Sequence, residues 1–300
     1  MDDRVFAVGY RPHERRGAPQ APWRPIARTL LVLAWRRRAT KIALLVCAAV
    51  ALGAGFALVG QVLMERFNPG SIGLSPQAIV GSAGETLSIY LRTQFYFTAI
   101  ALAAIAGGCV ADDRAAGAFE LYFARPLTVA DYAWGKLLGA GAVPLVTLIV
   151  PALVLWLVAA GISPPDVSGD LWRLGLPTLL GAALAAVVLT TTIVGLSAMG
   201  QKGRTVGVAY VTGLIVLAMI GTGLDSAGFE LGGYLVPERN LRTVVDALLQ
   251  VGAPSVFAQV LGPRRFESNE DVVLSLVALI ALSLAGLGLL RYRLGREVVA

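Results

Sequence analysis

Residues 111–139, ADDRAAGAFELYFARPLTVADYAWGKLLG, form a charged, aromatic and proline-interrupted segment between two long apolar stretches. Each neighbouring stretch is close to the roughly 20 apolar residues that a helix needs to cross a membrane. The internal order of the polar segment is too regular for a simple connecting loop. We therefore interpret residues 112–136 as an ordered element at a membrane surface, where it faces water.

The composition of the whole chain favours a membrane protein. Of its 300 residues, 56% are hydrophobic and only 15% are charged, whereas soluble domains carry roughly 25% charged residues. The net charge of +6 does not indicate a nucleic-acid partner, because the basic residues cluster beside apolar stretches, where they set membrane orientation. Cys47 and Cys109 lie inside apolar stretches without metal or redox spacing, so we interpret them as packing residues.

Six apolar stretches without Asp, Glu, Lys or Arg are predicted to span the membrane. They cover residues 42–63, 94–111, 137–160, 174–199, 205–224 and 272–290. Pro144, Pro151 and Pro177 provide local reasons for the third and fourth stretches to bend. The predicted fold class is an all-α polytopic membrane protein, with a six-helix transmembrane domain over residues 42–290.

The distribution of Lys and Arg predicts the orientation. Ten of them lie in residues 1–41, two more (Lys202 and Arg204) in the turn 200–204, and three in residues 291–300. The loops on the other side are poorer in basic residues: residues 64–93 contain Arg66 and Arg92, and residues 161–173 contain Arg173. The loop 225–271 has four basic residues against seven acids. Because positive charge marks the cytoplasmic face, we expect a multi-pass protein of the cytoplasmic (inner) membrane with both termini in the cytoplasm.

The N-terminal region is predicted to contain a surface helix rather than a signal peptide, because the first apolar run begins late. Residues 1–23 are expected to be a disordered cytoplasmic tail, and residues 24–41 an amphipathic interfacial helix, with Ile26, Leu30 and Leu33 on one face. The alternative is a short apolar patch before the first span. Residues 291–300 are expected to form a second cytoplasmic tail.

The outer loop 225–271 contains an apolar section, residues 241–262, that is interrupted at Gly252 and Pro254. Each piece is too short to span the membrane, so we expect two short outer helices. The competing interpretation is a seventh span. It would bury Asp246 and move the C-terminus outside, against the charge pattern.

Within residues 112–136, a short helix is predicted around Gly117 to Phe123, and it ends at Arg125-Pro126 because the residue before proline avoids helical geometry. Thr128 and Asp131 have the spacing of a capping box, which starts the next helix. Four large apolar side chains on so short a helix require a membrane face or a protein partner. An ordinary interfacial loop is the alternative.

This segment resembles the signature of the ABC type-2 export permeases, and the six-span layout, the N-terminal surface helix and the large loop before the last span are similar as well. The matching residues are Asp113, Gly117, Phe119, Glu120, Leu121, Ala124, Pro126, Leu127, Thr128, Gly135 and Lys136. The chain departs from the usual pattern at Asp113, where the family commonly has Glu, and at Phe119, where Thr is commoner.

The resemblance implies a permease subunit that is not itself an enzyme and that works together with partner subunits. It would pair with a second copy or a paralogue and bind two cytoplasmic ATP-binding cassette ATPase subunits, which would hold ATP and Mg while this chain binds no cofactor. The ATPase-coupling contact would consist of Asp113, Arg114, Gly117, Phe119, Glu120, Leu121, Arg125, Pro126 and Lys136.

Two alternatives accompany that expectation. Glu120 is expected to transmit the ATPase movement. The alternative is that its carboxylate forms an ion pair within this chain, with Arg114, Arg125 or Lys136. The whole chain has the alternative of a non-transporting membrane anchor or assembly factor that recruits a soluble partner through residues 112–136.

Other chemistries are poorly supported by the sequence. Gln201 occupies the position where a phosphate loop needs Lys, and Met199 replaces the last Gly of a serine-hydrolase elbow. The predicted spans lack the mid-membrane carboxylates of ion-coupled transporters, and no metal site is expected. Thr190, Thr191 and Thr192 are candidates for lining a path, with hydrogen bonds to their own helix as the alternative.

Overall fold

The computed structural model describes residues 21–67, 76–123, 127–163, 165–251 and 268–299. Over these ranges the regular structure is helical, without strands. Six helical segments are long and apolar enough to cross a membrane: Arg38–Met64, Val80–Ala115, Val129–Ile162, Val167–Met199, Gly203–Ser226 and Asn269–Arg296. Within the part of the chain that the structure describes, the predicted all-α architecture of a multi-pass membrane protein is therefore confirmed, with six candidate spans near the predicted positions.

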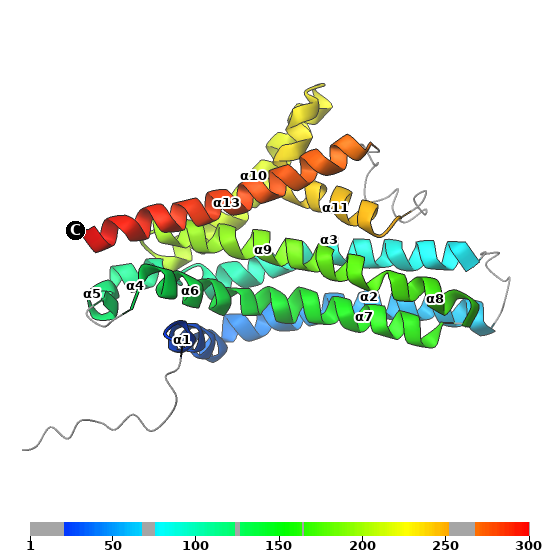
Figure 1. The fold of residues 1–300 in the computed structure, drawn as a ribbon, viewed down its shortest axis with the longest axis horizontal. Helices are drawn as coiled ribbons and strands as arrows, with labels where there is room; N and C mark the ends of the chain where they lie inside the picture. Colours follow the sequence, from blue (N-terminus) through cyan, green and yellow to red (C-terminus); the bar gives the residue numbers. More distant parts are fainter. Residues whose placement is uncertain (1–20, 68–75, 124–126, 164, 252–267, 300) are drawn as a thin grey trace, which may run out of the picture.

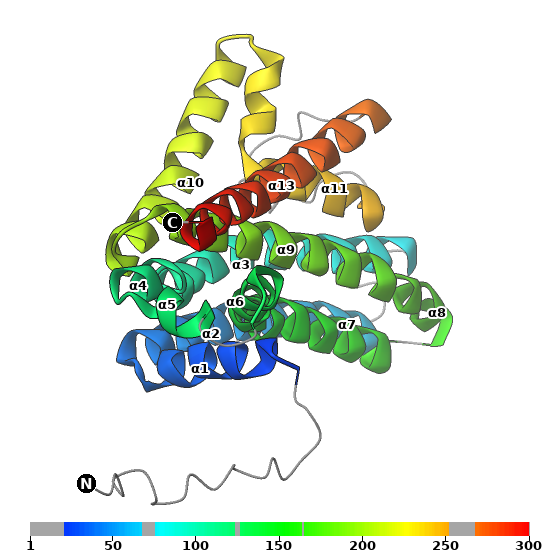
Figure 2. The same cartoon turned by 60° about the vertical axis from the view of Figure 1, so that its left-hand side comes forward.

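Most of the long helices lie side by side, whereas Gly203–Ser226 (α10) runs away from the others along its length (Figure 1 and Figure 2). Short helices gather at the two ends of the bundle. One end carries α4, α5 and the C-terminal end of α13, and the other carries α8 and the end of α11; we name them the α4–α5 end and the α8–α11 end. The helices are α1 Trp23–Arg36, α2 Arg38–Phe67, α3 Pro76–Ala106, α4 Ala111–Ala115, α5 Ala118–Phe123, α6 Val129–Pro144, η2 Leu145–Ile149, α7 Val150–Ile162, α8 Pro165–Arg173, α9 Gly175–Met199, α10 Gly203–Ser226, η3 Glu230–Leu235, α11 Pro237–Leu248 and α13 Asn269–Val299.

Helix α9 is the centre of the bundle, and it contacts α3, α6, α7, α10, α11 and α13. Apart from Leu189, its buried residues are small or β-branched, so other helices approach its backbone closely. The closest approach is to α13, where a Cβ added at Gly195 would meet the Gly286 Cα at 2.7 Å. Glycine is required on both sides of this crossing because the space for a side chain is taken by backbone atoms.

Three further glycines form close helix contacts within the chain. A Cβ added at Gly135 of α6 would meet Ile26 at 2.8 Å, and one added at Gly139 would meet the Ala27 backbone at 3.2 Å, so both face α1. A Cβ at Gly207 of α10 would meet the Ala103 carbonyl of α3 at 2.7 Å. These small-residue seams therefore join helices of one chain.

The third span changes geometry between its two prolines, as the sequence suggests. Residues Leu145–Ile149 form a π-helical turn directly after Pro144, and Pro151 lies at the start of α7. The carbonyl of Thr147 in this turn accepts hydrogen bonds from Gln94 Nε2 at 2.7 Å and from Tyr90 Oη at 3.1 Å. Because backbone groups in a membrane need protein partners, these two side chains of α3 stabilise the irregular turn.

Helix α3 is longer than predicted. It begins at Pro76, so the prediction of a loop up to residue 93 is wrong from that point, and Glu85 and Arg92 lie in the helix. Arg92 forms an ion pair with Glu238 of α11, and Ser88 donates a hydrogen bond to Asp246 of the same helix. The prediction of spans required stretches without charged residues, so it excluded Arg92 from the helix. In the tertiary structure the charge of Arg92 has an ionic partner, which makes its place in the helix acceptable.

The boundaries at both ends of the chain also differ from the prediction. Arg37 is extended (φ −81°, ψ 130°), so the predicted helix 24–41 is divided between α1 and the start of α2. Residues 291–299 continue α13 and do not form a separate tail. Of the tail predicted at residues 1–23, positions 1–20 lie outside the described residues, and Trp23 already belongs to α1.

The loop before the last span contains η3 and α11. Helix α11 ends at Leu248, and Gln250 has a positive φ of 50°. A continuous helix over residues 241–262 is therefore interrupted after Leu248, and the described part of this loop, up to residue 251, contains no helix long enough to span a membrane. The second predicted piece falls largely within residues 252–267, outside the described residues.

Candidate functional site

The segment around α4 is attached to the turn between α9 and α10 by side chains of opposite charge. Arg114 donates hydrogen bonds from Nη1 to the Ala198 carbonyl at 3.0 Å and from Nη2 to the Gly200 carbonyl at 2.5 Å. Asp112 Oδ1 accepts a hydrogen bond from the Gly203 N–H at 2.9 Å. Helix ends leave carbonyls unpaired at the C-terminus and N–H groups unpaired at the N-terminus. The cation therefore caps the end of α9, and the anion caps the start of α10, each matching the helix dipole.

Ser197 of α9 adds a further contact between α9 and the start of α4. Its fully buried hydroxyl oxygen accepts hydrogen bonds from the N–H groups of Val110 at 3.0 Å and Ala111 at 3.2 Å. These N–H groups belong to the start of α4, where no carbonyl of the helix can reach them. The end of α3, all of α4 and the α9–α10 turn thus share one hydrogen-bonded junction.

Asp113 connects α4 to α6. Lys136 Nζ lies 2.6 Å from Asp113 Oδ2, and Tyr132 Oη donates a hydrogen bond to the same oxygen at 2.8 Å. The Lys136 side chain is only 7% exposed and that of Asp113 21% exposed. A charged pair this deep needs its partner, because an unpaired buried charge is costly.

Helix α5 packs on α6 through aromatic rings. Phe119 and Tyr132 form an edge-to-face pair with ring centroids 5.4 Å apart, and Tyr122 lies 5.5 Å from Tyr132. Burial, and to a lesser extent the Asp113 carboxylate, raise the pKa of Tyr122 above its usual value, so its phenol stays neutral at physiological pH. Edge-to-face pairs contribute about 0.5–1.5 kcal/mol beyond burial, which holds α5 against the bundle.

The junction between α4 and α5 depends on a glycine. Gly117 has φ +64°, a left-handed conformation that glycine adopts without steric cost. A Cβ at this position would meet nothing within 4 Å, so conformation rather than space explains the residue. The chain can therefore reverse sharply here, and α5 folds back towards α6.

The structure brings together four of the predicted contact residues: Asp113, Arg114, Phe119 and Lys136. Their polar or aromatic groups contact other parts of this chain. Phe119 is only 7% exposed, so the apolar surface attributed to it from the sequence is covered by Tyr132 of the same chain. Of the remaining predictions, Glu120 and Leu121 lie on α5 with undescribed side chains, and Arg125 and Pro126 fall outside the described residues.

Three residues that the sequence reasoning did not select complete the site. Asp112, Tyr132 and Ser197 supply the cap on α10, the second bond to Asp113 and the bond to the start of α4. The pair of adjacent acids at 112–113 was a visible signal for Asp112. Nothing local marked Ser197, because its partners lie 86 and 87 residues away in sequence.

The three threonines of α9 are buried beside other helices. Thr191 Oγ1 donates to the Val187 carbonyl at 2.8 Å, and Thr192 Oγ1 donates to the Val188 carbonyl at 2.7 Å. Hydrogen bonding to the same helix is thus confirmed for these two, whereas Thr190 Oγ1 has no partner among the described residues. A path-lining role stays a prediction.

The described residues contain no group of three or more His, Cys, Asp or Glu that could hold a metal ion. The arrangement around α4 is a junction in which one short segment is bonded to several spans. In comparisons with known proteins, neither a protein-family model nor a curated protein matches the chain.

Proposed function

We propose that this chain is the permease subunit of an ATP-binding cassette transporter, acting as an exporter, and that a separate ATPase subunit moves it through the α4–α5 segment. One observation carries the proposal: α4 is covalently continuous with α3, hydrogen-bonded to the α9–α10 turn and ion-paired with α6. A displacement applied at this segment would therefore act on four membrane spans together.

The mechanism follows from the strengths of these bonds. Hydrogen bonds to charged groups contribute roughly 1.5–3 kcal/mol each, and Arg114 alone makes two of them. Gly117 lies between α4, which makes these bonds, and α5, which contains Glu120. We expect α5 to receive the ATPase movement and α4 to pass it to the spans, while ATP and Mg are bound only by the partner.

Several finer assignments belong to the same proposal. The α4–α5 end would face the cytoplasm, with both termini, so that α8 and α11 lie at the outer surface of the inner membrane. Helix α1 would lie on the cytoplasmic leaflet, because its exposed face combines Arg24, Arg28 and Arg36 with Val32 and Leu33, and basic helices of this kind bind anionic lipid surfaces.

A second permease copy or a paralogue would complete the transporter. This part of the proposal rests on the resemblance to ABC type-2 export permeases, since the described small-residue seams join helices of one chain. Thr190, Thr191 and Thr192 are retained as candidates for the substrate path.

The proposed orientation predicts which side of the membrane each end of the chain occupies. A reporter that is active only in the cytoplasm should be active when fused after Ala300, and a reporter active only outside should be active when inserted within residues 252–267. The physical reason is the concentration of Lys and Arg at the α4–α5 end. Activity of an outside-only reporter at the C-terminus would reverse the proposed orientation.

The proposed mechanism predicts that Arg114→Gln weakens coupling more than it weakens ATPase binding. The purified wild-type complex with its ATPase, reconstituted in proteoliposomes, should transport substrate in proportion to ATP hydrolysed. Loss of the two charged hydrogen bonds should lower transport per ATP by about tenfold, which corresponds to roughly 1.4 kcal/mol. The measurements are co-purification of the ATPase, ATP hydrolysis and transport, each on the same preparation.

Arg173→Gln is the matched control, because Arg173 is 84% exposed and its pair with Asp170 lies at the α8–α11 end. It should leave all three measurements unchanged. Equal transport per ATP in wild type and Arg114→Gln would show that the α4 junction does not transmit the movement. A chain that retains a soluble partner without any ATP hydrolysis would favour the membrane-anchor alternative.

A further inference from the structure

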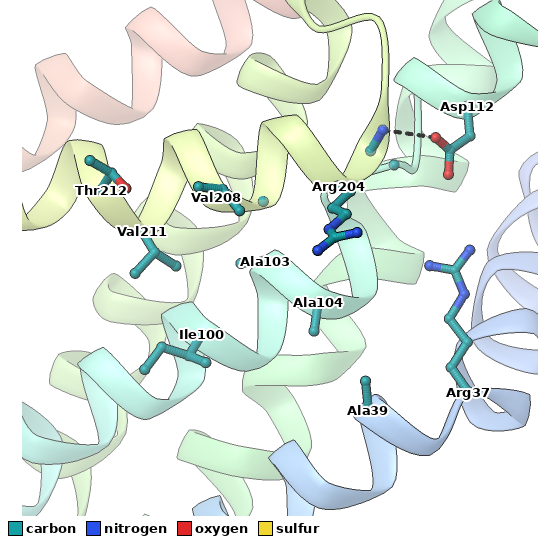
Figure 3. Close-up of a pocket in the computed structure, with 13 residues that line it drawn as sticks. Arg37, Ala39, Ile100, Ala103, Ala104, Asp112, Arg204, Val208, Val211 and Thr212 are labelled. Carbon is teal, nitrogen blue, oxygen red and sulfur yellow. Dashed lines mark hydrogen bonds between the residues drawn. The ribbon is translucent and has the colours of Figure 1, made fainter.

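A cavity of about 540 Å³ lies at the α4–α5 end, between the break that separates α1 from α2, helix α3 and helix α10 (Figure 3). It shares Asp112 and Gly203 with the contact between α4 and α10, but its lining does not include the residues that bond α4 to α6 and α9. Its size falls in the range of small-ligand sites, which is roughly 300–1,000 Å³. The elements that line it are far apart in sequence, so only the folded chain creates it.

One end of the cavity is basic. Arg37, at the extended residue between α1 and α2, and Arg204, in the first turn of α10, point their guanidinium groups into the same gap (Figure 3). Both side chains are exposed, and neither forms a salt bridge with a carboxylate among the described residues. Two guanidinium groups that face one gap offer several N–H donors to an anion that lies between them.

Asp112 is the acidic residue in the lining, and its charge is partly engaged elsewhere. Its Oδ1 accepts the Gly203 N–H at the start of α10. The two arginines and this aspartate leave a formal charge of +1 on the lining. A single negative group such as a phosphodiester would balance that charge, and guanidinium groups bind phosphate oxygens in bidentate geometry.

The rest of the cavity is apolar. Ile100, Ala103 and Ala104 of α3 face Val208 and Val211 of α10, and Ile100 and Val208 are 49% and 62% exposed. A free phosphate ion would leave these side chains uncovered. An amphiphile would place its charged group on the arginines and its hydrocarbon chain along this wall, which is formed by two helices apolar enough to span the membrane.

We propose that this cavity binds an anionic phospholipid, with its phosphate between Arg37 and Arg204 and the start of an acyl chain against Ile100 and Val208. The bound lipid joins the α1–α2 junction to α10. This site is independent of the proposed transport function, because it requires only a chain embedded in a membrane.

The test uses the full chain, purified in detergent and freed of lipid. Native mass spectrometry measures the binding of phosphatidylglycerol, of phosphatidylcholine with the same acyl chains, and of inorganic phosphate. The wild-type chain should bind one molecule of phosphatidylglycerol, and more tightly than it binds phosphatidylcholine or inorganic phosphate. The variant Arg37→Gln/Arg204→Gln should bind it about tenfold more weakly, because charge-assisted bonds are lost.

Two further variants separate the site from general surface attraction. Arg24→Gln/Arg28→Gln removes the same charge from the exposed face of α1 and should leave the tight binding intact. Ala104→Phe fills the apolar part without changing charge, at an exposed position that accepts a larger side chain, and should also weaken binding. It keeps the proposal testable if the Arg37→Gln/Arg204→Gln chain does not fold.

Three results would overturn the proposal. The first is unchanged phosphatidylglycerol binding by both Arg37→Gln/Arg204→Gln and Ala104→Phe. The second is equal weakening by the Arg24→Gln/Arg28→Gln control, which would indicate diffuse attraction to the surface. The third is binding of inorganic phosphate as tight as that of the lipid, which would show that the apolar wall contributes nothing.

Discussion

Replacing Gly286 by valine is expected to lower the stability of the bundle by about 3 kcal/mol, the upper part of the usual range for overpacking. An added Cβ would meet the Thr191 carbonyl carbon at 2.7 Å and the Thr192 nitrogen at 3.0 Å. Both are backbone atoms of α9, so no side-chain rotation relieves the clash. The two helices must separate, and the other helices packed on α9 lose contacts as well.

Gly288→Val is the matched control for this prediction. Gly288 lies on the same helix two residues further along, and an added Cβ there meets nothing within 4 Å. Thermal unfolding in detergent, followed by tryptophan fluorescence and by gel filtration of the soluble fraction, should show a large loss for the Gly286 variant and little change for the control. Equal unfolding midpoints for the two variants would contradict the close α9–α13 crossing.

Replacing Lys136 by methionine is expected to cost about 3 kcal/mol of stability. Methionine keeps much of the length of the side chain, but it leaves the Asp113 carboxylate with Tyr132 as its remaining described polar partner. Removing one member of a buried ion pair costs roughly 3–5 kcal/mol. The value for this pair is placed at the lower end because Asp113 is 21% exposed, and water partly solvates it.

A double-mutant cycle with Asp113→Asn tests the origin of that loss. The double variant has no charge at either position, so it should be more stable than Lys136→Met alone, as measured by thermal unfolding in the same detergent. Arg173→Met is the control, because it removes an ion pair that is 84% and 59% exposed and that contributes little. Strict additivity of the two single changes would mean that the pair makes no stabilising contact.

The features that could be predicted from the sequence are those set by neighbouring residues. The six spans follow from the length of apolar runs. The capping box of Thr128 and Asp131 is present, with the Asp131 N–H donating to Thr128 Oγ1 at 3.1 Å and the Thr128 N–H to Asp131 Oδ2 at 3.2 Å. The irregular turn after Pro144 follows from the missing N–H of proline. In each case the cause and its effect lie within one continuous stretch of the chain.

The candidate site was predicted only as a segment. The sequence located residues 112–136 between two spans, but it could not show that Asp113 and Lys136 form an ion pair or that Phe119 packs inward. It also placed Arg92 in a loop, since an isolated charge disfavours a membrane span and its partner, Glu238, lies far along the chain.

The sequence by itself therefore determined that this chain is a six-span helical membrane protein with an ordered polar segment between the second and third spans. Only the tertiary structure decided what that segment contacts. Hydropathy and capping act within one continuous stretch of the chain, whereas Asp112 and Gly203 are 91 positions apart and meet because α3, α9 and α10 pack together. The charge of a side chain limits the kinds of partner it can bind, and helix packing determines which of those partners lies close enough to contact it.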